Sequence, residues 1–331
     1  MTHLIILYGA NMSKIILGID ISKKHFDVSR YISDKHNNKK FINNNSGFKS
    51  LISWINQYTS NNIHICLEAT GVYGEALAEF MYKHGYKVSV VNPSCIKSYA
   101  KSKLSRHKTD KIDAQLIAEY CDKYNPNLWK PLPNEIKELR ELSRCIDSLK
   151  IQYNQVINQL ERKSDKSKLV SKVWEDLKLK IKFQINDLRQ KVDSLLIKSS
   201  YLNQAYKNLQ TIPGIAKTSA ITLLAEIPDI NTFNNAKQLA AYAGLSPSQK
   251  FSGSSVKGKS KLSKIGAKRL RKALFFPAIV AKKYNPYISK FCKVLENKGK
   301  HVFSIIGAAM RKLLHIVFVI LKNNTTFNYN L

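Results

Sequence analysis

Acidic residues are scarce in this chain: 23 Asp and Glu stand against 54 Lys and Arg, and the formal net charge is +31. A globular protein with this charge repels itself unless a polyanion binds it, which favours nucleic acid as the partner over an anionic membrane. Residues 230–331 contain one acid, Glu296, and 19 Lys and Arg. Carboxylate-based metal chemistry therefore cannot be built from this part alone, whereas a phosphate backbone can be held there.

Membrane, secretion and zinc signals are also missing. No uninterrupted apolar run reaches the roughly 18–20 residues that span a bilayer, and the N-terminus lacks the basic flank of a secretory signal. The five cysteines form no CxxC pair and no Cys/His cluster, which predicts free thiols in a reducing compartment and no structural zinc. We therefore expect a cytoplasmic protein with no membrane partner, associated with the nucleoid when bound. Its true start, Met1 or Met12, stays open.

The length of 331 residues predicts two or three domains, and the apolar share of 44% supplies ordinary cores. The first part of the chain alternates strand and helix signals. In chain order we predict two strands within 14–33, a strand near 40–42, a helix at 46–59, a strand at 63–68, a helix at 72–84, a strand at 87–91 and helices to about 123. This order indicates a mixed sheet flanked by helices.

Residues 135–200 change character, because apolar residues recur there at spacings of three and four. The pattern predicts two helices of about 30 residues, which form either a coiled-coil arm or an ordinary antiparallel hairpin. A helical domain follows from about 205. Within it, Ile212-Pro213-Gly214-Ile215 has the form of a helix-hairpin-helix turn, and Gly214 and Lys217 are candidates for phosphate contacts.

Four acids in the N-terminal part are placed to meet. Asp20 and Glu68 each end a predicted strand, and the ends of adjacent strands lie a few ångströms apart. Asp110 and Asp113 are three residues apart, a spacing that puts both on one face of a helix. Converging carboxylates repel each other unless cations lie between them, and such oxygen ligands suit Mg²⁺ or Mn²⁺. Two such ions can polarise a phosphodiester and activate the attacking oxygen.

These acids belong to a set of motifs that covers nearly the whole chain. The motifs are Gly18-Ile-Asp-Ile-Ser-Lys23, Glu68-Ala-Thr-Gly-Val-Tyr-Gly74, Lys108-Thr-Asp-Lys-Ile-Asp-Ala114, Ile212-Pro-Gly-Ile215, Tyr242-Ala-Gly-Leu-Ser-Pro247 and Phe251-Ser-Gly253. The set resembles the IS110/IS1111 family of insertion-sequence transposases, also called DEDD transposases. The resemblance implies an α/β RuvC-like (RNase H-like) domain at 12–125, a coiled-coil arm at 135–200 and a mainly α-helical transposase domain at 205–325.

The resemblance also implies a chemistry. Asp20, Glu68, Asp110 and Asp113 would be the catalytic, metal-binding acids, and Ser252 would form a covalent phosphoserine link to DNA. A hydroxyl needs a base, a metal or a cationic site to attack, and Ser252 lies in an acid-free, basic stretch. In the family the two cooperating domains are thought to come from different protomers of a dimer or tetramer. Here Ser254 and Ser255 follow where a basic residue is usual, so they are alternative nucleophiles.

Family members are guided by a structured non-coding RNA, which pairs with donor and target DNA, and the sequence contains no base-reading motif such as a zinc finger. The partners implied are therefore DNA and a guide RNA. The basic residues and the glycine that we predict to contact nucleic acid are Arg106, Lys108, Gly214, Lys217, Lys250, Lys257, Lys259, Lys261, Lys264, Lys268, Arg269 and Arg271.

Two other functions stay open at this point. A RuvC-like junction nuclease would use water as the nucleophile, so a Ser252→Ala variant would still nick DNA. A nucleic-acid-binding protein with a decayed active site would keep its binding in an Asp20→Asn variant, whereas an enzyme would lose catalysis.

Overall fold

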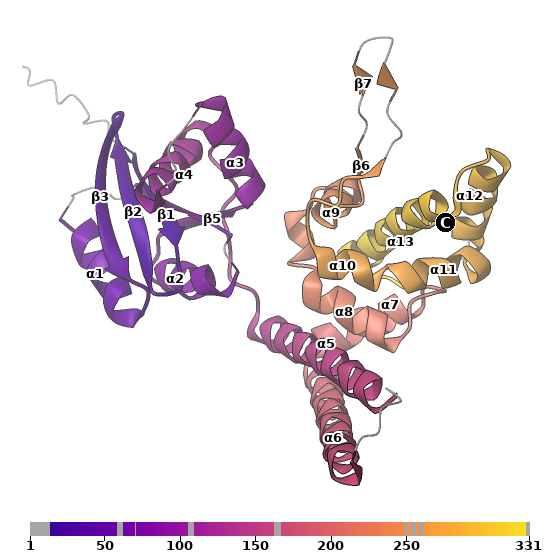
Figure 1. The fold of residues 1–331 in the computed structure, drawn as a ribbon. Helices are drawn as coiled ribbons and strands as arrows, with labels where there is room; N and C mark the ends of the chain where they lie inside the picture. The colour runs from indigo at the N-terminus through magenta and orange to yellow at the C-terminus, as the bar shows by residue number, and fades with distance from the viewer. Residues whose placement is uncertain are drawn as a thin grey trace, which may run out of the picture. The chain divides into compact units, whose positions relative to one another are not determined.

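The computed structural model describes residues 14–57, 62–69, 71–104, 109–161, 167–248, 251–252, 256–257 and 261–328, with only the backbone described at 72, 251–252 and 256–257. The chain divides after Pro131 into two compact units. We describe each unit by itself (Figure 1).

The N-terminal unit is built on a five-stranded mixed sheet. Its strands are β1 (Ile15–Ile21), β2 (His25–Ile32), β3 (Lys35–Ile42), β4 (Ile63–Glu68) and β5 (Lys87–Val91). They lie in the order β3-β2-β1-β4-β5, with β1–β2–β3 antiparallel and β4 and β5 parallel to β1. This arrangement is consistent with an RNase H-like domain and confirms the predicted mixed sheet. The strand β3 starts earlier than the strand predicted near 40–42. Its Lys- and Asn-rich first half has no apolar pattern, so this half could not be recognised from the sequence.

Helices cover both faces of this sheet (Figure 1). The four helices are α1 (Asn45–Ile55), α2 (Val72–Lys83), α3 (Pro93–Ser102) and α4 (Asp110–Tyr124). Alternate residues of β1 explain the layers: Ile15, Leu17 and Ile19 join the core under α1 and α2, while Ile16 packs with α3 and α4. Because side chains alternate between faces, Asp20 lies on the same face as Ile16, the face that α4 covers.

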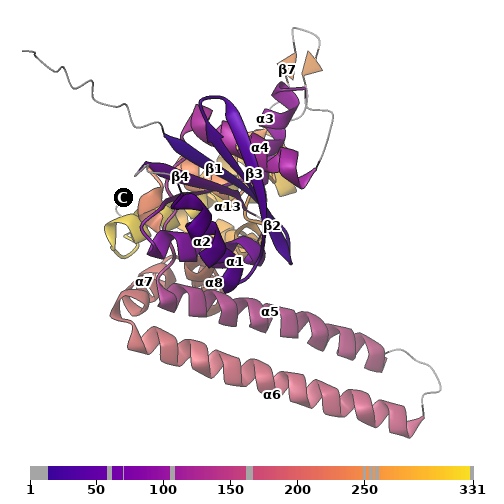
Figure 2. The same cartoon turned by 90° about the vertical axis from the view of Figure 1, so that its left-hand side faces the viewer.

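The second unit begins with two long helices, α5 (Asn134–Glu161) and α6 (Lys168–Lys198), which lie side by side (Figure 2). Their facing apolar residues are buried: Ile146 and Val156 on α5, Ile181 and Ile185 on α6. The two predicted helices are thus present, with bounds close to those expected. The outer end of α6 is less covered, since the Val170 and Leu177 side chains are 46% and 37% exposed.

The rest of this unit is mainly helical. The elements are α7 (Ser200–Gln210), α8 (Lys217–Glu226), the 3₁₀ turn η1 (Ile230–Thr232), α9 (Ala236–Tyr242), α10 (Lys268–Ala273), α11 (Phe275–Tyr284), α12 (Pro286–Asn297) and α13 (Val302–Asn323). By length and composition α13 is apolar enough to cross a membrane. Here Ile305, Leu313 and Val317 place it in the core of the unit, and Arg311 and Lys312 interrupt its apolar run.

One element of this unit was not predicted. Two short antiparallel strand pairs, β6 (Pro247–Ser248) with β9 (Lys261–Leu262) and β7 (Phe251–Ser252) with β8 (Val256–Lys257), run between α9 and α10. In Figure 1, β7 lies farther from α9 and α10 than β6 does. The Ser-, Gly- and Lys-rich sequence lacks the alternating apolar residues by which strands are recognised, so it read as a loop.

Candidate active site

Parallel pairing of β1 and β4 brings the first two acids together. The register aligns Ile19 with Leu67, and the next residue of each strand is Asp20 and Glu68. Neighbouring strands lie about 4.8 Å apart, and aligned residues point to the same face. Both side chains are half-buried. The expected meeting of two carboxylates at adjacent strand ends is therefore built into the sheet.

Helix α4 brings the other pair to the same face. Gly18, two residues before Asp20, lies directly against the helix, since an added Cβ would be 2.2 Å from the Ala114 carbonyl oxygen. Asp110 lies four residues before Ala114, about 6 Å along the helix axis. The side chain of Thr109 caps this helix by accepting the Ile112 N–H at 3.3 Å. The first turn of α4, with both acids, is thereby fixed near the end of β1.

The electrostatics of Asp20 report this convergence. Burial is the largest cause of its raised pKa, which moves from the ordinary 3.8 to about 6. The negative charges of the other three acids raise the pKa further, in the order Asp113, Asp110 and Glu68. A hydrogen bond from the Ile21 backbone N–H works in the opposite direction. The other three acids selected from the sequence therefore each act on Asp20 through space.

The predicted nucleophile lies in the second unit. The backbone of Ser252 is in β7 and is paired with Val256 of β8, and its side chain is not described. The strand pair β6–β9, which we call the base of the ribbon, is held by three flanking backbone hydrogen bonds. They run from Ser263 N–H to Ser246 O, from Lys264 N–H to Gly244 O, and from Ala267 N–H to Tyr242 O, at 2.8–3.1 Å. Ser252 itself belongs to a separate strand pair, β7 with β8. The alternatives Ser254 and Ser255 lie outside the described residues.

The predicted nucleic-acid contacts divide into three groups. Arg106, Lys108, Lys250 and Lys259 lie outside the described residues, and only the backbone of Lys257 is described. Lys261, Lys264 and Lys268 are exposed at the base of the ribbon and the start of α10. Lys217, Arg269 and Arg271 are engaged by other protein groups. Nucleic-acid contact stays a prediction for all of them.

Arg269 and Arg271 form contacts within the protein that could not be predicted from the sequence. Arg269 donates to Glu226 at 2.9 Å and pairs with Asp147, and Arg144 donates to both oxygens of Glu226 at 2.9 Å. Burial raises the pKa of Glu226, but the two guanidinium groups outweigh it and the net shift is downward. Arg271 donates to the Ala243 carbonyl at 2.8 Å. These contacts join α5, α8 and α10 and support the base of the ribbon.

Comparison with known proteins places the chain in a family. Residues 17–163 match a family model described as a transposase, and residues 206–293 match one described as the transposase IS116/IS110/IS902 family. The chain is 39% identical over 322 residues to the pilin gene-inverting protein of Moraxella bovis, covering 96% of this chain and 98% of that protein, and equally to the protein of that name in Moraxella lacunata.

The chain belongs to the IS110 family of transposases. It is also 24% identical over 215 residues to the transposase for insertion sequence element IS1111A of Coxiella burnetii, covering 57% of this chain and 58% of that protein. The resemblance inferred from the motifs is confirmed. An IS110-family transposase is a recombination enzyme that acts on DNA, which agrees with the net charge of +31.

The acids of this IS110-family chain fit a divalent cation by their chemistry. Four carboxylates are hard oxygen donors of the kind that Mg²⁺ and Mn²⁺ prefer, and the raised pKa of Asp20 records an excess of negative charge that a cation would offset. Among the described residues, no group of three or more His, Cys, Asp or Glu side chains is arranged to hold a metal ion. The donor set fits in type, and its side chains must draw closer to ligate one ion.

One residue of the IS110-family site gave no sequence signal. The Asn43 side-chain amide donates to the Ser22 carbonyl at 2.9 Å and to the Tyr73 carbonyl at 3.1 Å. It ties the segment after Asp20 to the segment after Glu68. Asn43 lies in a run of asparagines, so the sequence does not distinguish it from its neighbours. Its two hydrogen bonds in the folded structure identify it as a positioning residue.

The helix-hairpin-helix-like turn has a packing role in this transposase. Gly214 has φ +108°, and an added Cβ would lie 2.7 Å from the Pro277 carbonyl oxygen on α11. The glycine thus permits a close approach between segments of the protein. The neighbouring Lys217 forms an ion pair with Asp193 at 2.7 Å. The sequence predicted that this glycine lets the backbone approach a phosphate, whereas the structure places it against α11; a phosphate contact at this turn stays a prediction.

Proposed function

We propose that this IS110-family chain is a Mg²⁺-dependent DNA recombinase that cuts and rejoins strands through a covalent bond to Ser252. The observation that carries the proposal is the electrostatic coupling of Asp20 to Glu68, Asp110 and Asp113. Mutually repelling carboxylates are costly to keep together, and phosphodiester chemistry is a reason for such an arrangement. The family membership and the net charge of +31 point to the same substrate.

The acids would hold the cation. Burial and the charges of the other three acids raise the pKa of Asp20 in the metal-free protein, and a bound cation would favour the ionised, ligating form of this carboxyl. A bound divalent ion would neutralise charge on the phosphate and lower the pKa of the attacking hydroxyl. Asn43 would keep the segments that follow Asp20 and Glu68 in register.

Ser252 would attack phosphorus with its Oγ. One Oγ–P bond forms, one P–O bond to deoxyribose breaks, and the serine proton leaves with the released hydroxyl. The reverse step uses the hydroxyl of another strand, so the number of phosphoester bonds is conserved and rejoining needs no ATP. Backbone hydrogen bonds hold the β6–β9 pair, which is followed by α10, a helix rich in Lys and Arg.

The partners follow from the family resemblance. The chain would bind DNA together with a structured guide RNA, using the basic residues of 246–272, and would act in the cytoplasm as a dimer or tetramer. The α5–α6 pair would serve as a coiled-coil arm between protomers. The exposed Leu169, Val173 and Phe183 side chains on α6 offer apolar surface for such an assembly.

The near full-length similarity to proteins named as pilin gene inverters favours a second candidate, inversion of a DNA segment between two sites. Both candidates share the strand-exchange chemistry and differ in the arrangement of the DNA sites. A substrate with two inverted sites on one molecule, compared with separate donor and target molecules, would distinguish them by product length.

The test of the shared chemistry is a covalent adduct. Protein, Mg²⁺, the DNA that flanks its gene and RNA transcribed from that DNA are incubated, and peptide–DNA adducts are mapped by mass spectrometry. We expect the adduct at Ser252 and its loss in Ser252→Ala and in Asp20→Asn. Nicking by Ser252→Ala without any adduct would instead establish a hydrolytic nuclease. Binding without cleavage by the unmodified chain would establish a decayed enzyme.

A further inference from the structure

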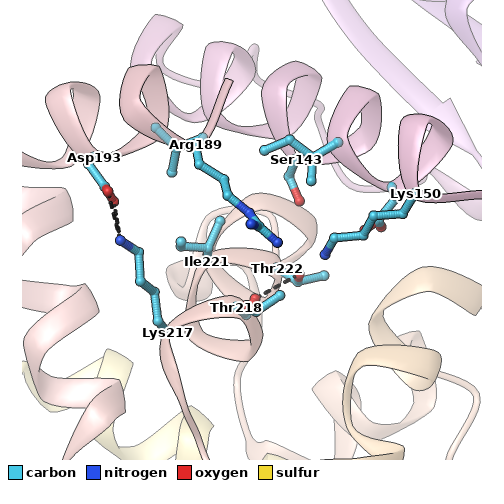
Figure 3. A pocket seen from close by; sticks show the side chains of 11 residues that line it. Ser143, Lys150, Arg189, Asp193, Lys217, Thr218, Ile221 and Thr222 are labelled. Atoms are coloured by element: carbon cyan, nitrogen blue, oxygen red, sulfur yellow. Dashed lines mark hydrogen bonds and ion pairs between the residues drawn. The ribbon is translucent and has the colours of Figure 1, made fainter. Parts of the chain in front are cut away.

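A cavity of about 310 Å³ lies within the second unit, between α5, α6 and the start of α8 (Figure 3). None of the four acids is among its lining residues, and neither is Ser252. The lining combines apolar side chains, Ile146, Val192 and Ile221, with polar ones. No motif in the sequence indicated it, because its lining comes from three helices that are distant along the chain.

Cationic side chains from three helices line this cavity. Lys150 comes from α5, Arg189 from α6 and Lys217 from α8. In Figure 3 the Arg189 guanidinium and the Lys150 ammonium point into the same space above Thr218 and Thr222. Arg189 donates to Asn186 at a long 3.4 Å. Within the described ranges, the structure records no ion pair for Lys150 or Arg189.

The acids of the lining are neutralised by other groups. Asp193 pairs with Lys217 at 2.7 Å, and Asp147 pairs with Arg269. Since both carboxylates already face a cation, the charges of Lys150 and Arg189 are left without a counter-ion from the described residues. The cavity is therefore positive, and an anion that enters it meets two cations from different helices.

Neutral donors complete the lining. The Thr222 hydroxyl donates to the Thr218 carbonyl at 2.9 Å, while the Thr218 and Ser143 hydroxyls border the same space. Helix α8 starts here, and its N-cap Ala216 provides no side-chain acceptor for the first-turn N–H groups. Those N–H groups add partial positive charge at the helix start.

We propose that this cavity binds one phosphate of the DNA backbone, with Lys150 and Arg189 as its charged ligands. The inference rests on the proposed function for its partner, and it adds a second, non-catalytic contact to that function. The apolar side chains of the lining suit the sugar next to the phosphate, and the cations suit the phosphate oxygens. Phosphate contacts of this kind position a protein on DNA without reading sequence.

The proposal places the phosphate contact in this cavity, and not at the helix-hairpin-helix-like turn where the sequence predicted one. Gly214 faces α11, whereas the cavity lies where α8 meets α5 and α6. A phosphate held there would bridge the long helices and the C-terminal helices. The contact would fix where DNA crosses the base of α5 and α6.

The test measures DNA binding in the full-length chain, in an Asp20→Asn background so that cleavage does not interfere. A Lys150→Ala/Arg189→Ala double variant is compared with Lys180→Ala/Lys182→Ala, which removes the same charge from exposed positions of α6. Affinity for a DNA duplex is followed by fluorescence anisotropy over a salt series. Loss of one phosphate contact should weaken binding about tenfold and reduce the salt slope by about 0.9, while the control keeps the slope.

Several outcomes would overturn the proposal. Equal slopes in the two double variants exclude a phosphate at this site, and so does a wild-type chain that binds no DNA. A change of slope with RNA but not with DNA would exclude DNA as the occupant. Inorganic phosphate that raises the melting temperature of the wild type but not of the double variant, without any slope change for DNA, would indicate a free-phosphate site.

A second measurement covers the case in which the double variant does not fold. Lysine acetylation of the unmodified chain, with and without DNA, should show protection of Lys150 and none of Lys180. Equal protection of both would refute the site. Because neither measurement needs strand exchange, failure of the catalytic proposal would appear separately, as intact binding without a Ser252 adduct.

Discussion

Replacing Asp20 by asparagine should stabilise the N-terminal unit at neutral pH. The folded protein holds this carboxyl half-buried and beside three other acids, and its pKa rises from 3.8 to about 6. That displacement corresponds to roughly 3 kcal/mol of unfavourable free energy when the group is ionised, and solvent screening of the partly exposed carboxylate reduces the cost to about 2 kcal/mol. Asparagine has nearly the same shape and no charge, so Asp20→Asn removes this cost.

The sign of the pH dependence follows from the two pKa values. Below pH 3.8 Asp20 is protonated in the folded and the unfolded chain and costs nothing. Between pH 3.8 and about 6 the unfolded chain ionises first, so the stability of the wild type falls as the pH rises. Above about pH 6.5 the full cost is present. The advantage of the asparagine variant should therefore be near zero at pH 4 and reach a plateau near pH 7.

Thermal unfolding at pH 4 and pH 7.5, without divalent ions, measures the effect. For a unit of this size the gain at pH 7.5 should be about 5–10 °C in melting temperature. The matched control is Asp122→Asn, an acid in the same unit with a 49% exposed side chain and a long 3.6 Å pair to Lys14, which should change stability by less than about 0.5 kcal/mol.

Magnesium provides an independent check on the same reasoning. A cation among the four acids should raise the melting temperature of the wild type and have a smaller effect on Asp20→Asn. A variant that is no more stable than the wild type at pH 7.5, or equally stabilised at both pH values, would refute the electrostatic interpretation of the acidic cluster.

Three further predictions concern packing, ion pairing and metal removal. Gly18→Ala should destabilise the N-terminal unit by about 3 kcal/mol and abolish activity, because its Cβ would be 2.2 Å from the Ala114 carbonyl; an unchanged melting temperature would contradict this. Glu226→Ala should cost about 3–5 kcal/mol by leaving Arg144 and Arg269 without their buried partner. Glu226→Gln should flatten the loss of stability that acidification below about pH 4.5 causes, since the pKa of Glu226 is lowered in the fold; urea titrations at pH 3.5 and 7 measure both. Chelation of divalent cations should abolish strand cleavage and leave DNA binding intact, as measured by gel cleavage and anisotropy.

The sequence predicted the sheet and the acidic cluster because both depend on local patterns. Asp20 and Glu68 end apolar runs, and parallel strands bring such ends together. The long helices were equally visible from their apolar spacing, with α5 and α6 beginning and ending close to the expected residues.

Features that depend on distant partners could not be predicted. Arg269 looked like a nucleic-acid contact in a basic stretch, and its partners Glu226 and Asp147 lie 43 and 122 residues away. The ribbon at 247–262 has no apolar alternation, so its strands were invisible. The phosphate cavity draws its cations from α5, α6 and α8, and no spacing rule connects them.

Helix α4 packs directly on Gly18 of β1. This packing sets the distance between the acids of the strands, Asp20 and Glu68, and the two acids of the helix. The positions of Asp110 and Asp113 follow from the contact of Ala114 and Ala118 with the glycine, about one and two turns further along the helix. A single methyl group at position 18 would disturb this distance, because it would meet the backbone of the helix. For an engineer, the glycine under α4 is therefore the position to leave unchanged.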